Sequence, residues 1–201
     1  GYFMVYADVL RPLVKRYALP YDVALVLGGS LFIALSARIA VPLPFSPVPI
    51  TGQTLAVLLV GALLGSRRGT LSVLTYLAQG AAGLPVFAGG TAGIVHLIGP
   101  RGGYLMGFVF AAFLIGWLAE RGWDRRFGTT LAAMLLGNAV IYVVALPYLA
   151  TFVGLERVLA LGFYPFIIGD LAKGISAAFF LPAGWRLDGP EPAEIYGRKE
   201  I

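Results

Sequence analysis

The chain has 201 residues, of which 59% are hydrophobic and 12% are charged, and its mean hydropathy is +0.84. Soluble domains carry about 25% charged residues, so this composition predicts an integral membrane protein. The absence of Cys and the presence of a single His, His96, argue against disulfides, thiol nucleophiles, zinc sites and serine-histidine triads. No catalytic residue and no metal ligand is therefore predicted. The net charge of +5 is expected to report orientation in the membrane rather than nucleic-acid binding.

Six apolar runs, separated by Gly, Pro and charged residues, predict an all-α fold: an integral membrane six-helix bundle. About 20 helical residues are needed to cross a hydrocarbon core of about 30 Å. The second and third runs are short, so they are expected to tilt or to pack inside the bundle. No repeat or second domain is visible, and residues 1–201 are predicted to form one transmembrane domain. The predicted spans are residues 22–41, 53–65, 70–84, 104–119, 129–151 and 158–182.

The distribution of basic residues predicts how these spans are oriented. If the N-terminus is cytoplasmic, 11 of the 15 Lys and Arg residues fall on the cytoplasmic side, as the positive-inside rule requires. Trp117, Trp123 and Trp185 fall at the same boundary, where an aromatic belt is expected. Both termini are thus predicted to be cytoplasmic, with residues 1–20 forming a cytoplasmic or interfacial segment and residues 186–201 a cytoplasmic tail. The predicted location is the cell membrane.

The two long outward connections, residues 42–52 and 85–103, are apolar, rich in Pro and Gly, and nearly uncharged. Four prolines stiffen the first connection, and Phe45 contributes to its apolar face. This pattern predicts a lid over the outer mouth of the bundle, although an ordinary connector at the membrane surface would have a similar composition. Thr91 lies in a glycine-rich turn of the second connection and is a candidate for ligand contact. His96, in the same connection, is expected to be a bystander.

Asp170 and Lys173 lie in the middle of the last apolar run, where either charge would cost at least ~2.5 kcal/mol to place in hydrocarbon. Three residues apart on a helix, they share one face, which must point into the bundle. A salt bridge that only fixes helix packing is one explanation. A ligand site is the favoured interpretation, because the pair lies toward the outer loops and offers both a carboxylate acceptor and an ammonium donor.

Uncharged polar residues in the other spans are further candidates. Asn138 and Tyr142 share a face of the fifth span, and Gln79 lies inside the third. Tyr104 begins the fourth span, and Gln53 begins the second, beneath the proline-rich connection. Helix contacts, interfacial anchoring or helix capping would also explain these residues. The residues predicted to bind a substrate are Asp170, Lys173, Asn138, Tyr104, Gln53, Thr91, Phe45, Gln79 and Tyr142.

Small residues form a smooth stripe on the first span, at Ser30, Ala34 and Ala37. Such a stripe packs either against another helix of the same chain or against a separate membrane subunit, and the second possibility makes it a predicted docking surface. The chain has no G-x-x-x-x-G-K-[ST] motif, so it is not expected to hydrolyse ATP by that route. With no nucleophile or metal cluster in view, the chain is predicted not to be an enzyme.

Four motifs in fixed order carry more specific information than hydropathy. They are Ser36-Ala-Arg-Ile-Ala-Val-Pro-Leu-Pro-Phe-Ser-Pro-Val-Pro-Ile-Thr-Gly-Gln-Thr-Leu, Gly83-Leu-Pro-Val-Phe-Ala-Gly-Gly, Gly99-Pro-Arg-Gly-Gly-Tyr-Leu and Gly169-Asp-Leu-Ala-Lys. Together they closely resemble the BioY family, the substrate-binding S components of energy-coupling-factor (ECF) transporters for biotin. The resemblance extends from about Ser30 to Ala183.

The resemblance implies a six-helix bundle that binds biotin near its outer face, beneath the loop between the first two helices. The Asp and Lys motif of the family maps onto Asp170 and Lys173 as ligand-binding residues. The resemblance also implies partners, namely a transmembrane coupling (T) component and two cytoplasmic ATPase subunits, and a toppling movement that delivers the cargo. The stripe on the first span resembles the surface by which such components dock. Biotin is then the transported ligand, and no cofactor is expected.

Biotin suits the predicted residues chemically. Its thiophane ring and valeryl chain fit an apolar pocket, while its ureido group and carboxylate need polar partners. Asp170 is favoured for the ureido N–H groups, and the partner of Lys173 is left open. Three alternatives are a self-sufficient secondary transporter with a proton-relaying Asp/Lys pair, a membrane enzyme with Asp170 as a base, and a purely structural subunit.

Overall fold

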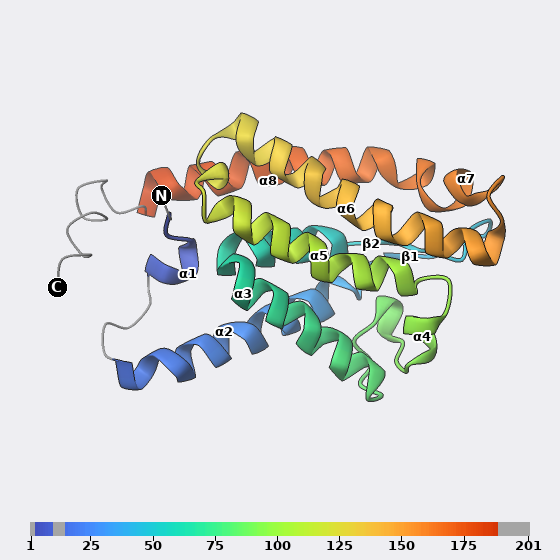
Figure 1. Cartoon of the computed structure of the whole chain (residues 1–201), viewed down its shortest axis with the longest axis horizontal. Coiled ribbons are helices and arrows are strands. Elements are labelled where there is room, and N and C mark those ends of the chain that lie inside the picture. Colours follow the sequence, from blue (N-terminus) through green and yellow to red (C-terminus); the bar gives the residue numbers. More distant parts are fainter. Residues whose placement is uncertain (1–2, 10–14, 189–201) are drawn as a thin grey trace.

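The computed structural model describes residues 3–9 and 15–188, and Figure 1 shows how its helices are arranged. The two short strands pair antiparallel, with Ala40 opposite Thr51. The helices are α1 (Tyr6–Val9), α2 (Lys15–Ser36), α3 (Gln53–Ala81), α4 (Val95–Ile98), α5 (Gly102–Ala119), α6 (Phe127–Val153), α7 (Val158–Gly162) and α8 (Ile167–Asp188); the strands are β1 (Ala40–Val41) and β2 (Ile50–Thr51), and the 3₁₀ turns are η1 (Ala88–Gly90), η2 (Trp123–Arg125) and η3 (Tyr164–Phe166).

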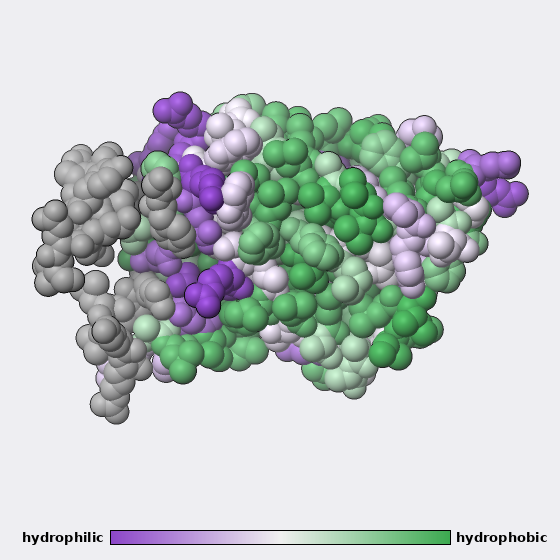
Figure 2. All heavy atoms as spheres, viewed as in Figure 1, coloured by the Kyte–Doolittle hydropathy of each residue, from purple (hydrophilic) through white to green (hydrophobic). Residues whose placement is uncertain are grey.

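The described residues contain five helical segments that are long and apolar enough to cross a membrane, at Tyr17–Ser36, Gln53–Ala81, Gly102–Ala119, Phe127–Val153 and Val158–Leu187. Figure 2 shows a broad band of hydrophobic side chains across the middle of the visible face, with hydrophilic residues gathered toward its two ends. An apolar band between polar ends is the surface that a bilayer solvates. The prediction of a helical membrane protein is confirmed.

The predicted spans 53–65 and 70–84 form one helical element, α3, which is broken at Gly65. Gly65 has φ +85° and ψ 175°, a backbone conformation that side chains disfavour and Gly adopts freely. An added Cβ on Gly69 would lie 2.9 Å from the Cα of Gly61. Eight residues along a straight helix are about 12 Å apart, so the two halves of α3 fold back against each other at Gly65.

The last predicted span, residues 158–182, is made of two helices, α7 and α8. Helix α7 ends at Gly162, Phe163 has non-helical φ and ψ of −129° and −62°, and the turn η3 with Pro165 leads into α8. Proline removes an amide donor and favours the first turn of a helix, so the chain restarts its helix after Pro165. Helix α8 then continues beyond the predicted end at residue 182, with Pro182 inside it.

The first span begins earlier than predicted. Helix α2 starts at Lys15 and contains Pro20, whereas the span was expected to start at residue 22. Pro20 is the sixth residue of α2, so it removes one backbone hydrogen bond from the helix. Residues 15–20 are thus helical and continuous with the first span.

Close approach of small residues sets the packing of the central helices. An added Cβ on Gly61 of α3 would lie 2.7 Å from the carbonyl oxygen of Ala112 on α5. An added Cβ on Gly107 of α5 would lie 3.0 Å from the Cα of Ile141 on α6. Helices in a bilayer associate mainly through such van der Waals packing, so α5 sits between α3 and α6 at distances that only small residues allow.

The stripe of small residues on α2 packs inside the chain. Ser30, Ala34 and Ala37 are all buried, and the hydroxyl of Ser30 donates a hydrogen bond of 2.8 Å to Oε1 of Gln79 on α3. Because all three residues are buried within the chain, they do not form a free docking surface. Gln79, which was predicted to bind a substrate, joins two helices instead.

The start of the described chain and the end of α8 lie at the same end of the molecule (Figure 1). The rings of Tyr6 and Trp185 are 4.1 Å apart between centroids, and the backbone amide of Phe3 donates to the carbonyl oxygen of Glu120. The β1–β2 hairpin, α4 and α7 lie at the opposite end. The two predicted outer loops thus share one end of the bundle, where the candidate site is found.

Candidate functional site

A pocket opens at the loop end of the bundle, between the β1–β2 hairpin, α4 and the ends of four long helices. The space between its lining atoms, including the open mouth, is about 650 Å³. Most of its wall is apolar, with polar groups at separate points. It is lined by Val48, Pro49, Thr51, Gln53, Thr54, Phe87, Ala88, His96, Arg101, Tyr104, Leu105, Phe108, Asn138, Ile141, Tyr142, Phe166, Asp170 and Lys173.

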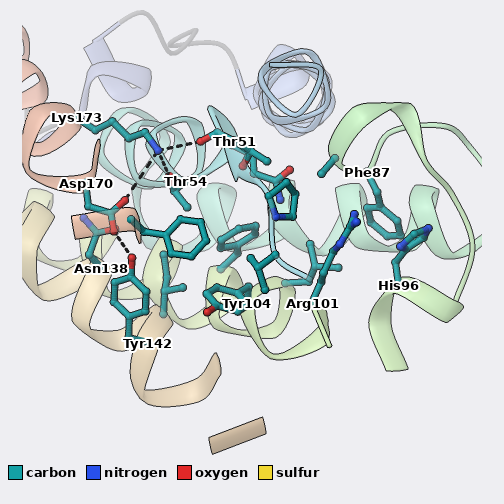
Figure 3. A pocket seen from close by; sticks show the side chains of 18 residues that line it. Thr51, Thr54, Phe87, His96, Arg101, Tyr104, Asn138, Tyr142, Asp170 and Lys173 are labelled. Atoms are coloured by element: carbon teal, nitrogen blue, oxygen red, sulfur yellow. Dashed lines mark hydrogen bonds and ion pairs between the residues drawn. The ribbon is translucent and has the colours of Figure 1, made fainter. Parts of the chain in front are cut away.

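Asp170 stands in the first turn of α8, where the helix dipole favours a carboxylate. The residue is only 8% exposed, and the hydroxyl of Tyr142 on α6 donates a hydrogen bond to its Oδ2 (Figure 3). Its Oδ1 lies 3.9 Å from Nζ of Lys173. Asn138, one turn before Tyr142 on α6, lines the same part of the pocket. Among the described residues, one carboxylate oxygen therefore accepts a hydrogen bond from Tyr142, while the other has only the ammonium group of Lys173 as a polar partner.

Lys173 reaches from α8 to the start of α3. Its Nζ donates a hydrogen bond of 2.9 Å to the carbonyl oxygen of Thr51 in β2 and another of 2.9 Å to Oγ1 of Thr54. The third proton of the ammonium group is left for Asp170, at 3.9 Å. These contacts, which Figure 3 shows as dashed lines, connect the hairpin to the last helix across the pocket.

An aromatic wall separates this polar group from the loops of α7. The hydroxyl of Tyr104 donates a 2.5 Å hydrogen bond to the carbonyl oxygen of Gly162. The ring of Tyr104 lies 6.4 Å from that of Tyr142 and 6.4 Å from that of Phe166, and the ring of Tyr142 lies 4.9 Å from that of Phe163. Edge contacts at these distances stabilise aromatic pairs, so the rings form a firm apolar surface beside Asp170.

A second polar group occupies the other side of the pocket (Figure 3). Nε of Arg101, just before α5, donates a 3.2 Å hydrogen bond to the carbonyl oxygen of Pro47 in the β1–β2 loop. Burial, followed by the charge of Arg101, lowers the pKa of His96, so its imidazole is neutral at pH 7. Phe87 is buried between the rings of His96 and Tyr76, at 5.9 Å and 5.6 Å. The pocket thus has an acidic side and a basic side.

Six of the nine residues predicted to bind a substrate line this pocket: Asp170, Lys173, Asn138, Tyr104, Gln53 and Tyr142. The other three lie outside its wall. Phe45 is 56% exposed on the hairpin loop, and Thr91 closes a turn by donating its hydroxyl to the carbonyl oxygen of Ala88. Gln79 contacts Ser30, as described above.

Sequence reasoning missed the basic side of the pocket. His96 was expected to be a bystander, yet it lines the pocket together with Arg101 and Phe87. One signal was present, because Arg101 and His96 are the only residues with ionisable side chains in the connection 85–103. In an otherwise apolar loop at a membrane surface, such residues are candidates for function.

The fold and the pocket define a helical membrane protein with a candidate small-molecule site under the loops at one end of its bundle. The chain belongs to the BioY family, whose model matches residues 12–189, and the predicted family is thereby confirmed. It is 40% identical over 160 residues to the biotin transporter BioY of Rhizobium etli, covering 76% of this chain and 86% of that protein. It is 42% identical over 149 residues to the probable biotin transporter BioY of Pyrococcus horikoshii, covering 74% and 88%.

A solved structure has a similar fold. It is the crystal structure of the S-component for biotin from an ECF-type ABC transporter, which superposes with a TM-score of 0.70 at 27% sequence identity. The match covers 87% of this chain and 95% of that chain. The similarity of fold therefore extends over most of the chain.

Proposed function

We propose that this chain is the high-affinity biotin-binding membrane subunit, the S component, of an ECF-type vitamin importer. The observation that carries this proposal is the polarity of the pocket: an acidic side at Asp170, a basic side at Arg101, and apolar and aromatic walls between them. Biotin has matching parts, with a ureido group at one end, a carboxylate at the other and an apolar middle. The named relatives and the similar structure belong to biotin transport.

The ureido end is assigned to Asp170 and Asn138. Tyr142 occupies Oδ2 of Asp170, which leaves Oδ1 to accept a ureido N–H. The amide of Asn138 is 7% exposed and lines the same side, and an amide supplies both a donor and an acceptor to a urea. A cyclic urea has two N–H groups and one carbonyl, so this pair satisfies its polar edge.

The carboxylate is assigned to Arg101 rather than to Lys173. Two donors of Lys173 are already used by Thr51 and Thr54, and the third faces Asp170. Arg101 uses Nε for the carbonyl oxygen of Pro47, and within residues 3–9 and 15–188 its two Nη groups have no hydrogen-bond partner. A guanidinium fork binds a carboxylate through two parallel hydrogen bonds. Arg101 is therefore the cation whose N–H donors are available for the carboxylate of the ligand.

The break in α3 supports six membrane crossings. Each half of α3 forms one crossing, and the halves meet at Gly65 beside the basic residues Arg67 and Arg68. The segment 3–9 and Trp185 share the end opposite the pocket. Since that end carries most of the basic residues, we place both termini in the cytoplasm and the pocket on the outer side.

Delivery of the ligand requires partners in this proposal. The chain carries no phosphate-binding loop motif, so we assign energy supply to two cytoplasmic ATPase subunits, joined to this chain by a transmembrane T component. Because the stripe at Ser30, Ala34 and Ala37 is buried, the T component is not assigned to it.

Calorimetry on the purified chain tests the ligand. Biotin should bind with one site per chain, whereas a chemically similar carboxylate that lacks the ureido ring, such as hexanoate, should not bind. Proteoliposomes then test the mode of transport, because the proposal expects no uptake by this chain alone under a proton gradient. Uptake under those conditions would favour a secondary transporter, and absence of biotin binding by a folded protein would refute the proposal.

A further inference from the structure

The loop that covers the pocket is held by side chains from below. Residues 42–49 connect β1 to β2 and contain four prolines, so few backbone amides are available to hold the loop in place. Three side chains compensate. The hydroxyl of Ser46 donates to the carbonyl oxygen of Leu161 at 2.6 Å, Arg101 donates to the carbonyl oxygen of Pro47, and Lys173 donates to that of Thr51.

Lys173 makes the most extensive of these attachments. Its ammonium group bonds at 2.9 Å to both the carbonyl oxygen of Thr51, at the end of the hairpin, and Oγ1 of Thr54, in the first turn of α3. The side chain is 21% exposed, so water competes weakly for these donors. Charge-assisted hydrogen bonds in such surroundings are about twice as strong as neutral ones.

We infer that Lys173 is a positioning residue that holds the β1–β2 hairpin closed over the pocket through bonds within the protein, independently of any ligand. The ammonium group joins the junction of β2 and α3 to α8, and so fixes the distance between the lid and Asp170. Without it, the hairpin would keep Ser46 and Arg101 as attachments but lose this hydrogen bond to α8. Only the consequence for ligand release rests on the proposed function.

Ordering of the lid in advance has a kinetic consequence. A ligand enclosed by an ordered lid leaves only when the lid opens, so loosening the hairpin should raise the dissociation rate more than it changes the association rate. If Lys173 acted only by direct contact with the ligand, replacing it would leave the ligand-free hairpin unchanged. The two roles therefore predict different rates of amide hydrogen exchange in the ligand-free hairpin.

Hydrogen exchange of the ligand-free protein in detergent tests the inference. In Lys173→Met, amides of the segment 43–52 should exchange about tenfold faster than in the wild type. The loss of a charge-assisted hydrogen bond changes the opening equilibrium of the segment by about this factor. Lys173→Arg, which retains donors and charge, should restore part of the protection. Ser176→Ala is the control on the same helix, since the hydroxyl of Ser176 donates within α8, to the carbonyl oxygen of Ala172, and its exchange in the segment 43–52 should equal that of the wild type.

Thr54→Val provides a second variant in case Lys173→Met does not fold. It removes one acceptor of Lys173 and should raise exchange in the segment 43–52 by about threefold, as expected for one hydrogen bond, with exchange in the interior of α5 unchanged. Unchanged exchange of the segment in a folded Lys173→Met or Thr54→Val protein would overturn the inference, as would an equal rise in α5.

Biotin binding, measured separately by calorimetry, keeps this test distinct from the proposed function. If the hairpin loosens in the Lys173 variant but the wild type does not bind biotin, the positioning role stands and the ligand assignment fails. If the wild type binds biotin but the hairpin of the Lys173 variant is unaffected, the ligand assignment stands and the positioning role fails. Where both hold, the dissociation rate of biotin from Thr54→Val should rise about threefold.

Discussion

Tyr142 donates its hydroxyl proton to Oδ2 of Asp170, and this bond joins α6 to α8 at the wall of the pocket. The ring of Tyr142 is itself held at 4.9 Å from Phe163 and 6.4 Å from Tyr104. The carboxylate of Asp170 is consequently fixed in orientation by a side chain from another helix, and its Oδ1 remains the oxygen that a ligand meets. A buried carboxylate with one committed and one open oxygen is suited to a single N–H donor from a ligand.

Replacing Asp170 by Asn should weaken biotin binding about 10- to 100-fold, because a charged acceptor becomes a neutral group that also presents donors. The shape of the side chain is preserved, so the protein should fold. Isothermal calorimetry gives the affinity, and the melting temperature in detergent serves as the control for folding. Wild-type affinity in a folded Asp170→Asn protein would contradict the assignment of the ureido group.

Tyr142→Phe should have a smaller effect. The aromatic contacts with Tyr104 and Phe163 remain, and only the hydroxyl that orients Asp170 is lost. We expect the affinity for biotin to fall about 2- to 10-fold, as for the loss of one hydrogen bond that acts on the ligand only through Asp170. In the double variant with Asp170→Asn, the two losses should not add, since both act on the same carboxylate. Fully additive losses, measured by calorimetry, would argue for independent roles.

Arg101 gives a prediction that separates the two ends of the ligand. Wild-type protein should prefer biotin over biotin methyl ester by about 10- to 100-fold, because the ester has no carboxylate for the guanidinium fork. Arg101→Gln should bind both compounds with similar affinity, close to that of the wild type for the ester. A preference for biotin that persists in Arg101→Gln would assign the carboxylate to another residue.

The family and the acidic side of the pocket were predictable from the sequence for definite reasons. A charged pair three residues apart in an apolar run has to face the bundle, so the place of Asp170 and Lys173 followed from helical periodicity and the cost of exposing charge to lipid. Asn138 and Tyr142 followed from the same reasoning on α6. The four motifs added the family, which hydropathy alone does not indicate.

The basic side and the partners of each residue were not predictable in the same way. His96 and Arg101 reach the pocket because η1 and α4 fold the connection 85–103 back over the bundle, and no periodic pattern marks that path. Ser30 and Gln79 are 49 residues apart and meet only through the packing of α2 on α3. Helical periodicity predicts the face of the helix on which a polar side chain lies, but not which residues it contacts. Its role therefore depends on contacts that are distant in sequence.

Asp124, in η2 between α5 and α6, predicts a dependence of stability on pH. It is 3% exposed, and burial raises the pKa of its carboxyl to about 6 from a usual value of 3.8, although Trp185 donates a 2.5 Å hydrogen bond to it. The unfolded carboxyl loses its proton near 3.8, whereas the folded one keeps it to about 6. The folded state is therefore favoured at low pH, and its stability falls as the pH rises from about 4 to about 6.

Above pH 6 the charged carboxylate of Asp124 lowers the free energy of unfolding by about 3 kcal/mol, because the pKa of this group differs by about two between the folded and unfolded states. In wild-type protein the melting temperature should be higher at pH 5 than at pH 7. Asp124→Asn keeps an acceptor for Trp185 but does not titrate, so the difference between the two pH values should shrink. An equal pH dependence in the wild type and in Asp124→Asn, measured by melting in detergent, would exclude Asp124 as its source.

Gly116 and Gly128 give a matched pair for testing how the core is packed. An added Cβ on Gly116 of α5 would overlap the backbone of Gly65 and Ser66, at the point where α3 is broken, and no flexible side chain could move aside. Gly116→Ala should therefore destabilise the fold by about 1–3 kcal/mol or more. Gly128, in the first turn of α6, has no atom within 4 Å of an added Cβ.

Gly128→Ala should accordingly be neutral or stabilising by up to about 1 kcal/mol, because Ala has the higher helix propensity. Melting temperatures of the two variants in the same detergent provide the comparison. Because both variants make the same chemical change within a helix, their difference isolates the contact between α5 and the break in α3. Similar melting temperatures for Gly116→Ala and Gly128→Ala would show that the two elements do not approach as closely as the structure has them.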